Sequence, residues 1–162
     1  MTPAPAAGAP VTVRMVCRVA GLSRSRIRAA VRAAAGDQSI RAIGVAVVDD
    51  ATIALLHGRY LADPRATDVM SFDLRDHPRD GELEGEIVIS AETAARQARA
   101  LGLRIDQEVL RYVVHGVLHL LGHDDKTASQ RRRMRRQENA VLSRLADRPD
   151  SACRLAPREG RV

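Results

Sequence analysis

Four stretches of the chain carry β-branched residues in alternating or continuous apolar patterns, which is typical of β-strands. They cover residues 11–19, 40–48, 68–74 and 83–90. The second stretch is apolar throughout and predicts a strand buried on both faces of a sheet. A polar loop rich in Pro and Gly, residues 76–81, separates the last two stretches, which predicts that they adjoin like a hairpin.

Five further stretches repeat apolar residues with the period of a helix. They cover about residues 25–35, 50–60, 91–101, 107–121 and 128–146. Side chains typical of N-caps precede three of them, namely Asp49-Asp50, Ser90 and Asp106, and glycines end three, namely Gly36, Gly102 and Gly122. Four strands with helices concentrated late in the chain indicate an α+β fold, in which one mixed four-stranded sheet is flanked by about five helices.

The 162 residues fit one compact unit. We expect a single domain over residues 11–147, a disordered Pro- and Ala-rich tail over residues 1–10, and a flexible tail over residues 148–162. No apolar run approaches the ~20 residues that span a membrane, and the start resembles no secretory signal. Cys17 and Cys153 match no metal or redox spacing. These features favour a cytoplasmic protein without a membrane partner.

The positive charge of the chain is almost entirely arginine. The formal net charge is +6, and arginine supplies all but one of the 26 basic residues. Arginine binds phosphate oxygens well, which favours a polyanionic partner, although such a composition is also typical of GC-rich genomes. The run RRRMRR, residues 131–136, covers every face of its helix, so part of it must be solvated. With two Tyr, one Phe and no Trp, the chain would bind nucleic acid mainly through phosphates.

The segment VVHGVLHLLGHDD carries the strongest candidate chemistry. His115 and His119 are four residues apart, so both project from one helical face about 6 Å apart and can bind one metal ion. His123 would lie about 12 Å from His115 along a straight helix. A left-handed residue at Gly122 would turn the chain back, so that Asp125 or His123 supplies the third ligand. The spacing HxxxHxxGxxD favours Asp125, the position of the third ligand in metzincin-type zinc proteins.

Three protein ligands leave a coordination position for water, which is typical of a catalytic zinc ion. The alternative, that the imidazoles only pack on a helix, fits less well with two histidines followed by Gly and an Asp pair. Gly116 stands where HExxH metalloproteases have their glutamate base, so activation of water would depend on the metal. Asp124 either accepts a proton and anchors the site, or serves only as a turn residue.

The segment HGVLHLLGHDD resembles the signature HGxLHLxGxDH of the YbeY family of bacterial endoribonucleases, which mature ribosomal RNA and take part in ribosome quality control. TDVMSF, residues 67–72, resembles the family's TDVLSF, and GEIVIS, residues 85–90, resembles its GDIVIS. Met134 and Glu138 match the MxxxE pattern of the last helix. The four motifs stand in register over roughly residues 45–145, and they imply a mixed four-stranded sheet with zinc held by three histidines.

Two departures from the family pattern concern the site. The third histidine falls at Asp125, whose carboxylate is an acceptable zinc ligand but reduces the net positive charge of the site. The family also places an arginine directly after the Tyr of the second helix, whereas Leu61 follows Tyr60 here. Either Arg59 or Arg65 could supply that phosphate-binding charge, or both are solvated. With Ser71 of the second motif they are the expected substrate-binding residues, and Arg59 and Asp124 are the candidate catalytic residues.

The resemblance implies a zinc-dependent endoribonuclease in which a zinc-bound water hydrolyses phosphodiester bonds of single-stranded RNA, with one Zn²⁺ per chain. The implied partners are ribosomal RNA and a small-subunit ribosomal protein, and no DNA is expected. Two alternatives remain. One is a ribosome-associated RNA-binding factor with little nuclease activity, whose structural metal would be enclosed by both His123 and Asp125. The other is a zinc hydrolase that acts on a substrate other than RNA.

Overall fold

The computed structural model describes residues 10–61, 67–77 and 81–146. Most of the two predicted tails, together with Cys153 and Arg65, lies outside these residues. No helix within the described ranges combines the length and the apolar character needed to cross a membrane.

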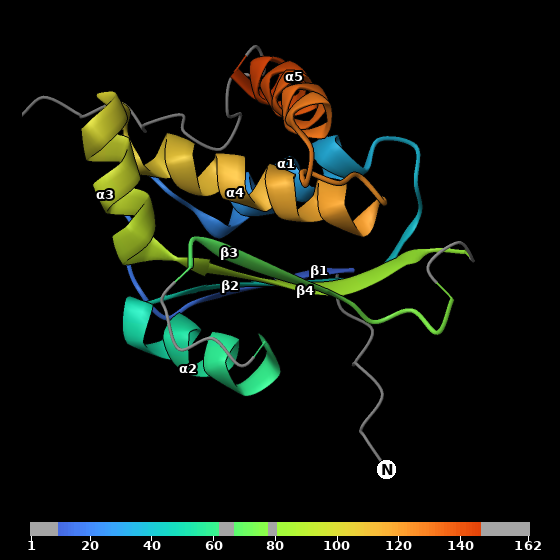
Figure 1. Ribbon diagram of the computed structural model, residues 1–162, viewed down its shortest axis with the longest axis horizontal. Helices are drawn as coiled ribbons and strands as arrows, with labels where there is room; N and C mark the ends of the chain where they lie inside the picture. The colour runs from blue at the N-terminus through green and yellow to red at the C-terminus, as the bar shows by residue number, and fades with distance from the viewer. Residues whose placement is uncertain (1–9, 62–66, 78–80, 147–162) are drawn as a thin grey trace, which may run out of the picture.

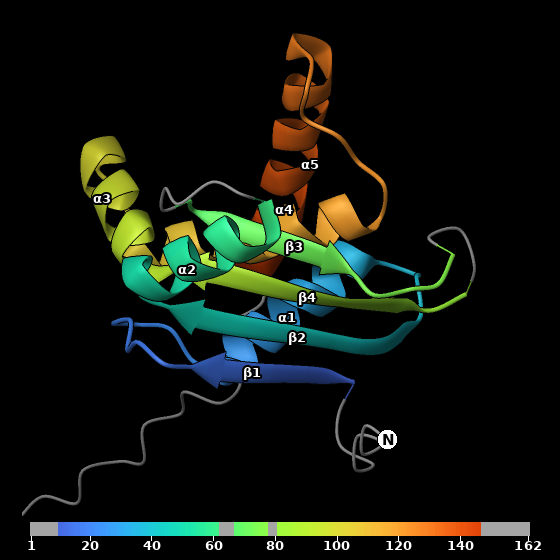
Figure 2. The same cartoon turned by 60° about the horizontal axis from the view of Figure 1, so that its bottom comes forward.

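The centre of the fold is one mixed sheet of four strands, as predicted. The strands are β1 (Val11–Met15), β2 (Ile40–Val48), β3 (Val69–Asp73) and β4 (Leu83–Ser90), in the order β1-β2-β4-β3. β1, β2 and β4 run parallel, and β3 pairs antiparallel with β4 at one edge (Figure 2). The predicted adjoining pair of residues 68–74 and 83–90 is therefore confirmed.

Helices cover both faces of this sheet (Figure 1). α1 (Arg24–Ala35) and α4 (Ile105–Leu120) pack on one face, and α2 (Asp50–Leu61) packs on the other. α3 (Ala91–Leu101) lies beside α4, while α5 (Ala128–Ala146) packs on α1 and α4 on the side away from the sheet. The apolar run of β2 is buried on both faces, as predicted, because Val45 and Val47 face the main core while Val48 faces the α2 side.

Two predicted boundaries were wrong. The first strand was expected to reach residue 19 but ends at Met15. The amides of Val16 and Cys17 both donate to the carbonyl of Val47, so the chain leaves the sheet where the neighbouring strand β2 comes to its end. Val19 is still buried, which shows that an apolar pattern can continue into a covered turn.

Asp106 is not the N-cap that we expected. α4 begins at Ile105 with Arg104 as its N-cap, and the side chain of Gln107 accepts a hydrogen bond from the Arg104 amide at 3.3 Å. Asp106 lies in the first turn, 1% exposed, and its carboxylate accepts hydrogen bonds from Arg26 at 2.7 Å and from Arg104 at 2.8 Å. A carboxylate in the first turn stabilises the helix, because its negative charge lies at the positive end of the helix dipole. Its ion pair with Arg26 also connects α4 to α1.

A second carboxylate network joins the start of α2 to the start of α3. Asp50 accepts hydrogen bonds from Arg96 at 2.7 Å, from Thr93 at 2.8 Å and from the hydroxyl of Ser90. The bond from Arg96, with those from Ser90 and Thr93, lowers the pKa of Asp50 from 3.8 to about 2. Since the folded pKa lies below the ordinary value, the carboxylate stabilises the fold above about pH 4, and this contribution is lost as the pH falls towards 2.

Asp50→Asn should therefore lower the free energy of unfolding at pH 7 by about 1–2 kcal/mol, an amount reduced from the full pKa shift because the network is partly solvated. The gap between wild type and variant should close as the pH falls from about 4 towards 2. Urea denaturation of both proteins across this range measures the gap. A gap of constant size at every pH would show that the charge of Asp50 does not contribute.

Candidate metal centre

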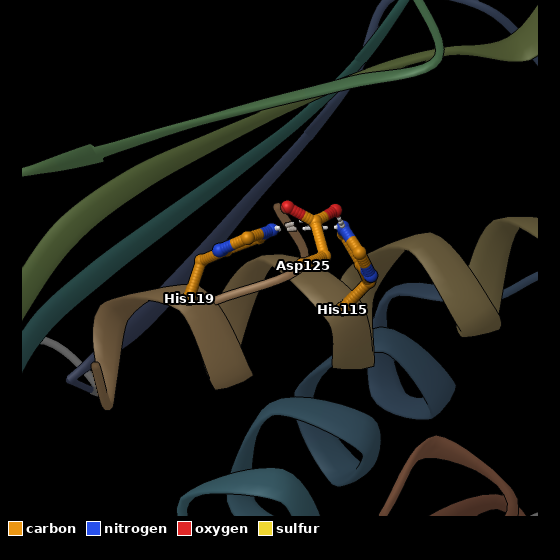
Figure 3. A group of neighbouring side chains, drawn as sticks. All are labelled: His115, His119 and Asp125. Carbon is orange, nitrogen blue, oxygen red and sulfur yellow. Dashed lines mark hydrogen bonds and ion pairs between the residues drawn. The ribbon is translucent and has the colours of Figure 1, made fainter. Parts of the chain in front are cut away.

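Two imidazoles near the C-terminal end of α4 approach each other closely (Figure 3). The Nε2 atoms of His115 and His119 lie 2.9 Å apart, and the rings meet edge to face with centroids 4.5 Å apart. Both residues lie on one face of α4, as the four-residue spacing predicts. Between them in sequence, Gly116 lets α4 lie close to β4, because a Cβ atom there would be 2.9 Å from the side chain of Ile87.

The chain beyond α4 turns back over the helix end at Gly122, as predicted. Gly122 has a φ of 94°, in the left-handed region that favours glycine. Its amide donates to the carbonyl of His119 at 2.9 Å, and the His123 amide donates to Leu118 at 3.0 Å. This pair of bonds is the Schellman motif. The turn brings Oδ2 of Asp125 to 3.6 Å from the Nε2 atom of each histidine (Figure 3).

Two arginines hold this helix end and loop in place. Arg75, which follows β3 and is paired with Asp73, donates to the carbonyl of Leu120 at 2.6 Å. Arg131, in the first turn of α5, donates to the carbonyls of Asp125 at 3.3 Å and Lys126 at 2.9 Å. The loop that carries Asp125 is therefore fixed from the sheet side and from α5. Neither contact follows from a local sequence pattern.

His115, His119 and Asp125 fit a small divalent ion. One ligand atom of each lies within 4.8 Å of the others, the only such group of three found in the described part of the chain. Two imidazole nitrogens and a carboxylate oxygen are a typical donor set for zinc. Their side chains are 22%, 26% and 41% exposed, so the group remains accessible to water or substrate. The structure thus brings together the three residues that the spacing favoured.

Glu138 supports the group from α5. Its buried carboxylate lies 2.6 Å from Nδ1 of His115, and Arg111 donates to the same carboxylate at 3.2 Å. Burial alone would lower the pKa of His115, but the hydrogen bond to Glu138 and the charges of Glu138, Asp125 and Asp68 outweigh it and raise this pKa above 6.5. A carboxylate on Nδ1 directs Nε2 towards a metal ion. Glu138 belongs to the MxxxE pattern, but that pattern does not by itself indicate this role.

His123 and Asp124 lie outside the metal group. With Gly122, Gln130, Arg133 and Met134 they line a small cavity of about 140 Å³ between the loop and α5. Asp124 is exposed and His123 is half-buried. The expected role of Asp124 as a proton acceptor remains a prediction.

The predicted substrate-binding residues are spread over the fold. Arg59 is exposed in the last turn of α2, on the opposite face of the sheet from α4, with its guanidinium 6.0 Å from the ring centroid of Tyr60. Ser71 is half-buried on β3 opposite Ile87 of the main core, so it points to the α4 side of the sheet. Arg65 lies outside the described residues. Within the described residues, no hydrogen bond or ion pair joins Arg59 or Ser71 to the metal group, and the roles of both remain predictions.

Comparisons with known proteins agree with this fold and identify the family. A model of the family described as endoribonuclease YbeY matches residues 18–146. The endoribonuclease YbeY of Anaeromyxobacter dehalogenans is 40% identical over 139 residues, which cover 86% of this chain and 72% of the relative. That of Aquifex aeolicus is 40% identical over 105 residues, covering 64% and 70%. The fold is shared with the solution structure of TM1509 from Thermotoga maritima, with a TM-score of 0.53. That match has 22% sequence identity and covers 90% of this chain and 100% of that chain. The chain therefore belongs to the endoribonuclease YbeY family.

Proposed function

We propose that this protein is a zinc-dependent endoribonuclease that hydrolyses phosphodiester bonds of single-stranded RNA during ribosomal RNA maturation and ribosome quality control. The observation that supports it most is the partly exposed group of His115, His119 and Asp125 in a chain of this family. One Zn²⁺ would be held by the Nε2 atoms of the two histidines and by the Asp125 carboxylate. When bound, the ion would polarise a phosphoryl oxygen and lower the pKa of a coordinated water.

The chain's own residues would orient the ligands and the substrate. Glu138 holds the His115 ring, and Arg131 holds the backbone of Asp125. Asp124, exposed beside Asp125, would accept a proton. Arg59 and Arg65 would bind substrate phosphates, and Ser71 would contact the substrate from β3. These four assignments belong to the proposal.

The two alternatives are less well supported. A structural metal enclosed by both His123 and Asp125 would need His123 near the other ligands, and the described group does not include it. A hydrolase with another substrate would use the same ligands, so only a substrate test separates it from an endoribonuclease. Ribosomal RNA and a small-subunit ribosomal protein are the partners we propose.

The function is tested by incubating the zinc-loaded protein with single-stranded RNA, with the matching duplex, and with single-stranded DNA of the same sequence. We expect cleavage of the single-stranded RNA only, loss of cleavage after chelation, and recovery when zinc is added. His119→Ala is the control for a contaminating nuclease and should be inactive. Cleavage that survives chelation, or equal cleavage of DNA, would rule the proposal out.

A further inference from the structure

The N-terminal half of α5 carries more positive charge than the one arginine, Arg131, that supports the metal centre. Five of the six residues 131–136 are arginines, and all five are exposed. The helix holds six arginines but a single carboxylate, Glu138, which is buried against His115. Within the described part of the chain, Arg132, Arg135 and Arg136 form no ion pair or hydrogen bond. The charge of this helix is therefore not balanced by its own side chains.

This arrangement carries an energetic cost. Arg131 and Arg135 are four residues apart, as are Arg132 and Arg136, so like charges face each other along the helix. Each such pair destabilises a helix by about 0.2–0.5 kcal/mol. A polyanion bound along the helix would remove this repulsion and turn it into attraction.

One flank of α5 borders the metal centre. Arg131 donates to the carbonyl of Asp125, and Asn139 accepts a hydrogen bond from Arg111 of α4, which also binds Glu138. Residues three or four apart on a helix share a face, so Arg135 lies between Arg131 and Asn139, and Arg132, three residues before Arg135, lies beside it. In Figure 2, α5 extends beyond the β3 edge of the sheet, and Arg131, Arg132 and Arg135 on this part of the helix are exposed.

We propose that Arg131, Arg132 and Arg135, the arginine row, bind phosphates of the RNA strand next to the position of cleavage. This inference rests on the proposed function, because the strand must continue from the metal centre onto α5. Arginine suits it, since its planar fork matches phosphate oxygens. Only 2% of residues are aromatic, so contact through phosphates is favoured over base stacking. An anion bound by the row would lie next to the substrate bound at the metal group. A continuous RNA strand can occupy both places, which favours RNA over a separate acidic protein.

The test compares two double variants that remove the same charge from the same helix. Arg132→Gln/Arg135→Gln alters the row, whereas Arg133→Gln/Arg144→Gln alters exposed arginines on the far side of the helix from Arg135. For the row variant we expect the KM for a long single-stranded RNA to rise about tenfold with kcat unchanged. The slope of log Kd against log salt, measured by fluorescence anisotropy, should fall by about 1.4, since each lost phosphate contact accounts for about 0.7. The control should behave nearly as wild type, and both variants should keep the wild-type melting temperature.

Each other outcome has a defined meaning. Equal loss of RNA binding in both variants would show a general charge effect and overturn the proposal. Polyglutamate is a second competitor for the row. If it competed as effectively as RNA of equal charge, the row would be a site for an acidic protein, and the proposal would be overturned. A wild-type protein that cleaves no RNA would refute the proposed function, whereas RNA binding that depends on the row but not on the control arginines would still support the row.

Discussion

Asp125→Ala should abolish tight zinc binding and RNA cleavage while leaving the protein folded. The variant removes the oxygen that lies 3.6 Å from both imidazoles and leaves two ligands, too few to hold the ion. We expect metal affinity and cleavage rate to fall by at least about 10²-fold, more than the ~10–100-fold that follows loss of an outer hydrogen-bond partner. Competition with a coloured chelator measures the affinity, and cleavage of single-stranded RNA measures the rate.

Neighbouring residues supply matched controls for this prediction. His123→Ala should keep zinc, because His123 lies outside the metal group, and Asp124→Ala should also keep zinc while testing the role of Asp124 in proton transfer. Asp125→His should retain the ion, since imidazole is an equally suitable ligand. If Asp125→Ala kept its zinc and its activity while His123→Ala lost both, the third ligand would be His123.

Replacing Glu138 should weaken zinc binding although Glu138 is not itself expected to bind the ion. Its carboxylate fixes the His115 ring through a 2.6 Å contact to Nδ1. Loss of such a partner reduces metal affinity by about 10–100-fold. Glu138→Gln keeps a hydrogen-bond acceptor, so its loss of zinc affinity should be near tenfold. Glu138→Leu removes both the acceptor and the charge, so its loss should be near 100-fold. The same chelator competition gives both values.

Val141→Ala separates this effect from simple loss of stability. Val141 is 4% exposed on the same helix, and its truncation should cost about 1–3 kcal/mol without touching the ligands. Zinc affinity should stay near the wild-type value in Val141→Ala. If this variant lost zinc as strongly as Glu138→Leu, the role of Glu138 would be to stabilise α5 rather than to orient His115.

The parts of this protein that could be predicted from sequence depend on neighbours along the chain. The apolar run of β2 and the histidine pair of α4 both follow from local periodicity, and the turn at Gly122 follows from its freedom at positive φ. Boundaries that depend on a partner were missed. The first strand ends at Met15 because β2 provides no further pairing, and Asp106 turned inward to bind arginines instead of capping α4.

The support around the metal centre could not be predicted in the same way. Glu138 follows His115 by 23 residues, and only the packing of α5 on α4 brings them together. Arg75 reaches Leu120 from a strand end 45 residues away. Even Gly116 has a tertiary explanation, since the proximity of Ile87 leaves no room for the glutamate that HExxH proteins place there.

The position of Glu138 and Arg131 on α5 makes metal binding and helix docking thermodynamically linked. α5 is the outer layer of the fold, yet it contacts two candidate metal ligands. Glu138 binds the ring of His115, and the side chain of Arg131 binds the backbone carbonyl of Asp125. Linkage is reciprocal: if docking of α5 strengthens metal binding by a given free energy, metal binding stabilises the docked state of α5 by the same amount. A bound ion would thus stabilise the docked position of α5 as well as serve the reaction, and loss of the metal should weaken the packing of α5 on α4 while the protein stays folded.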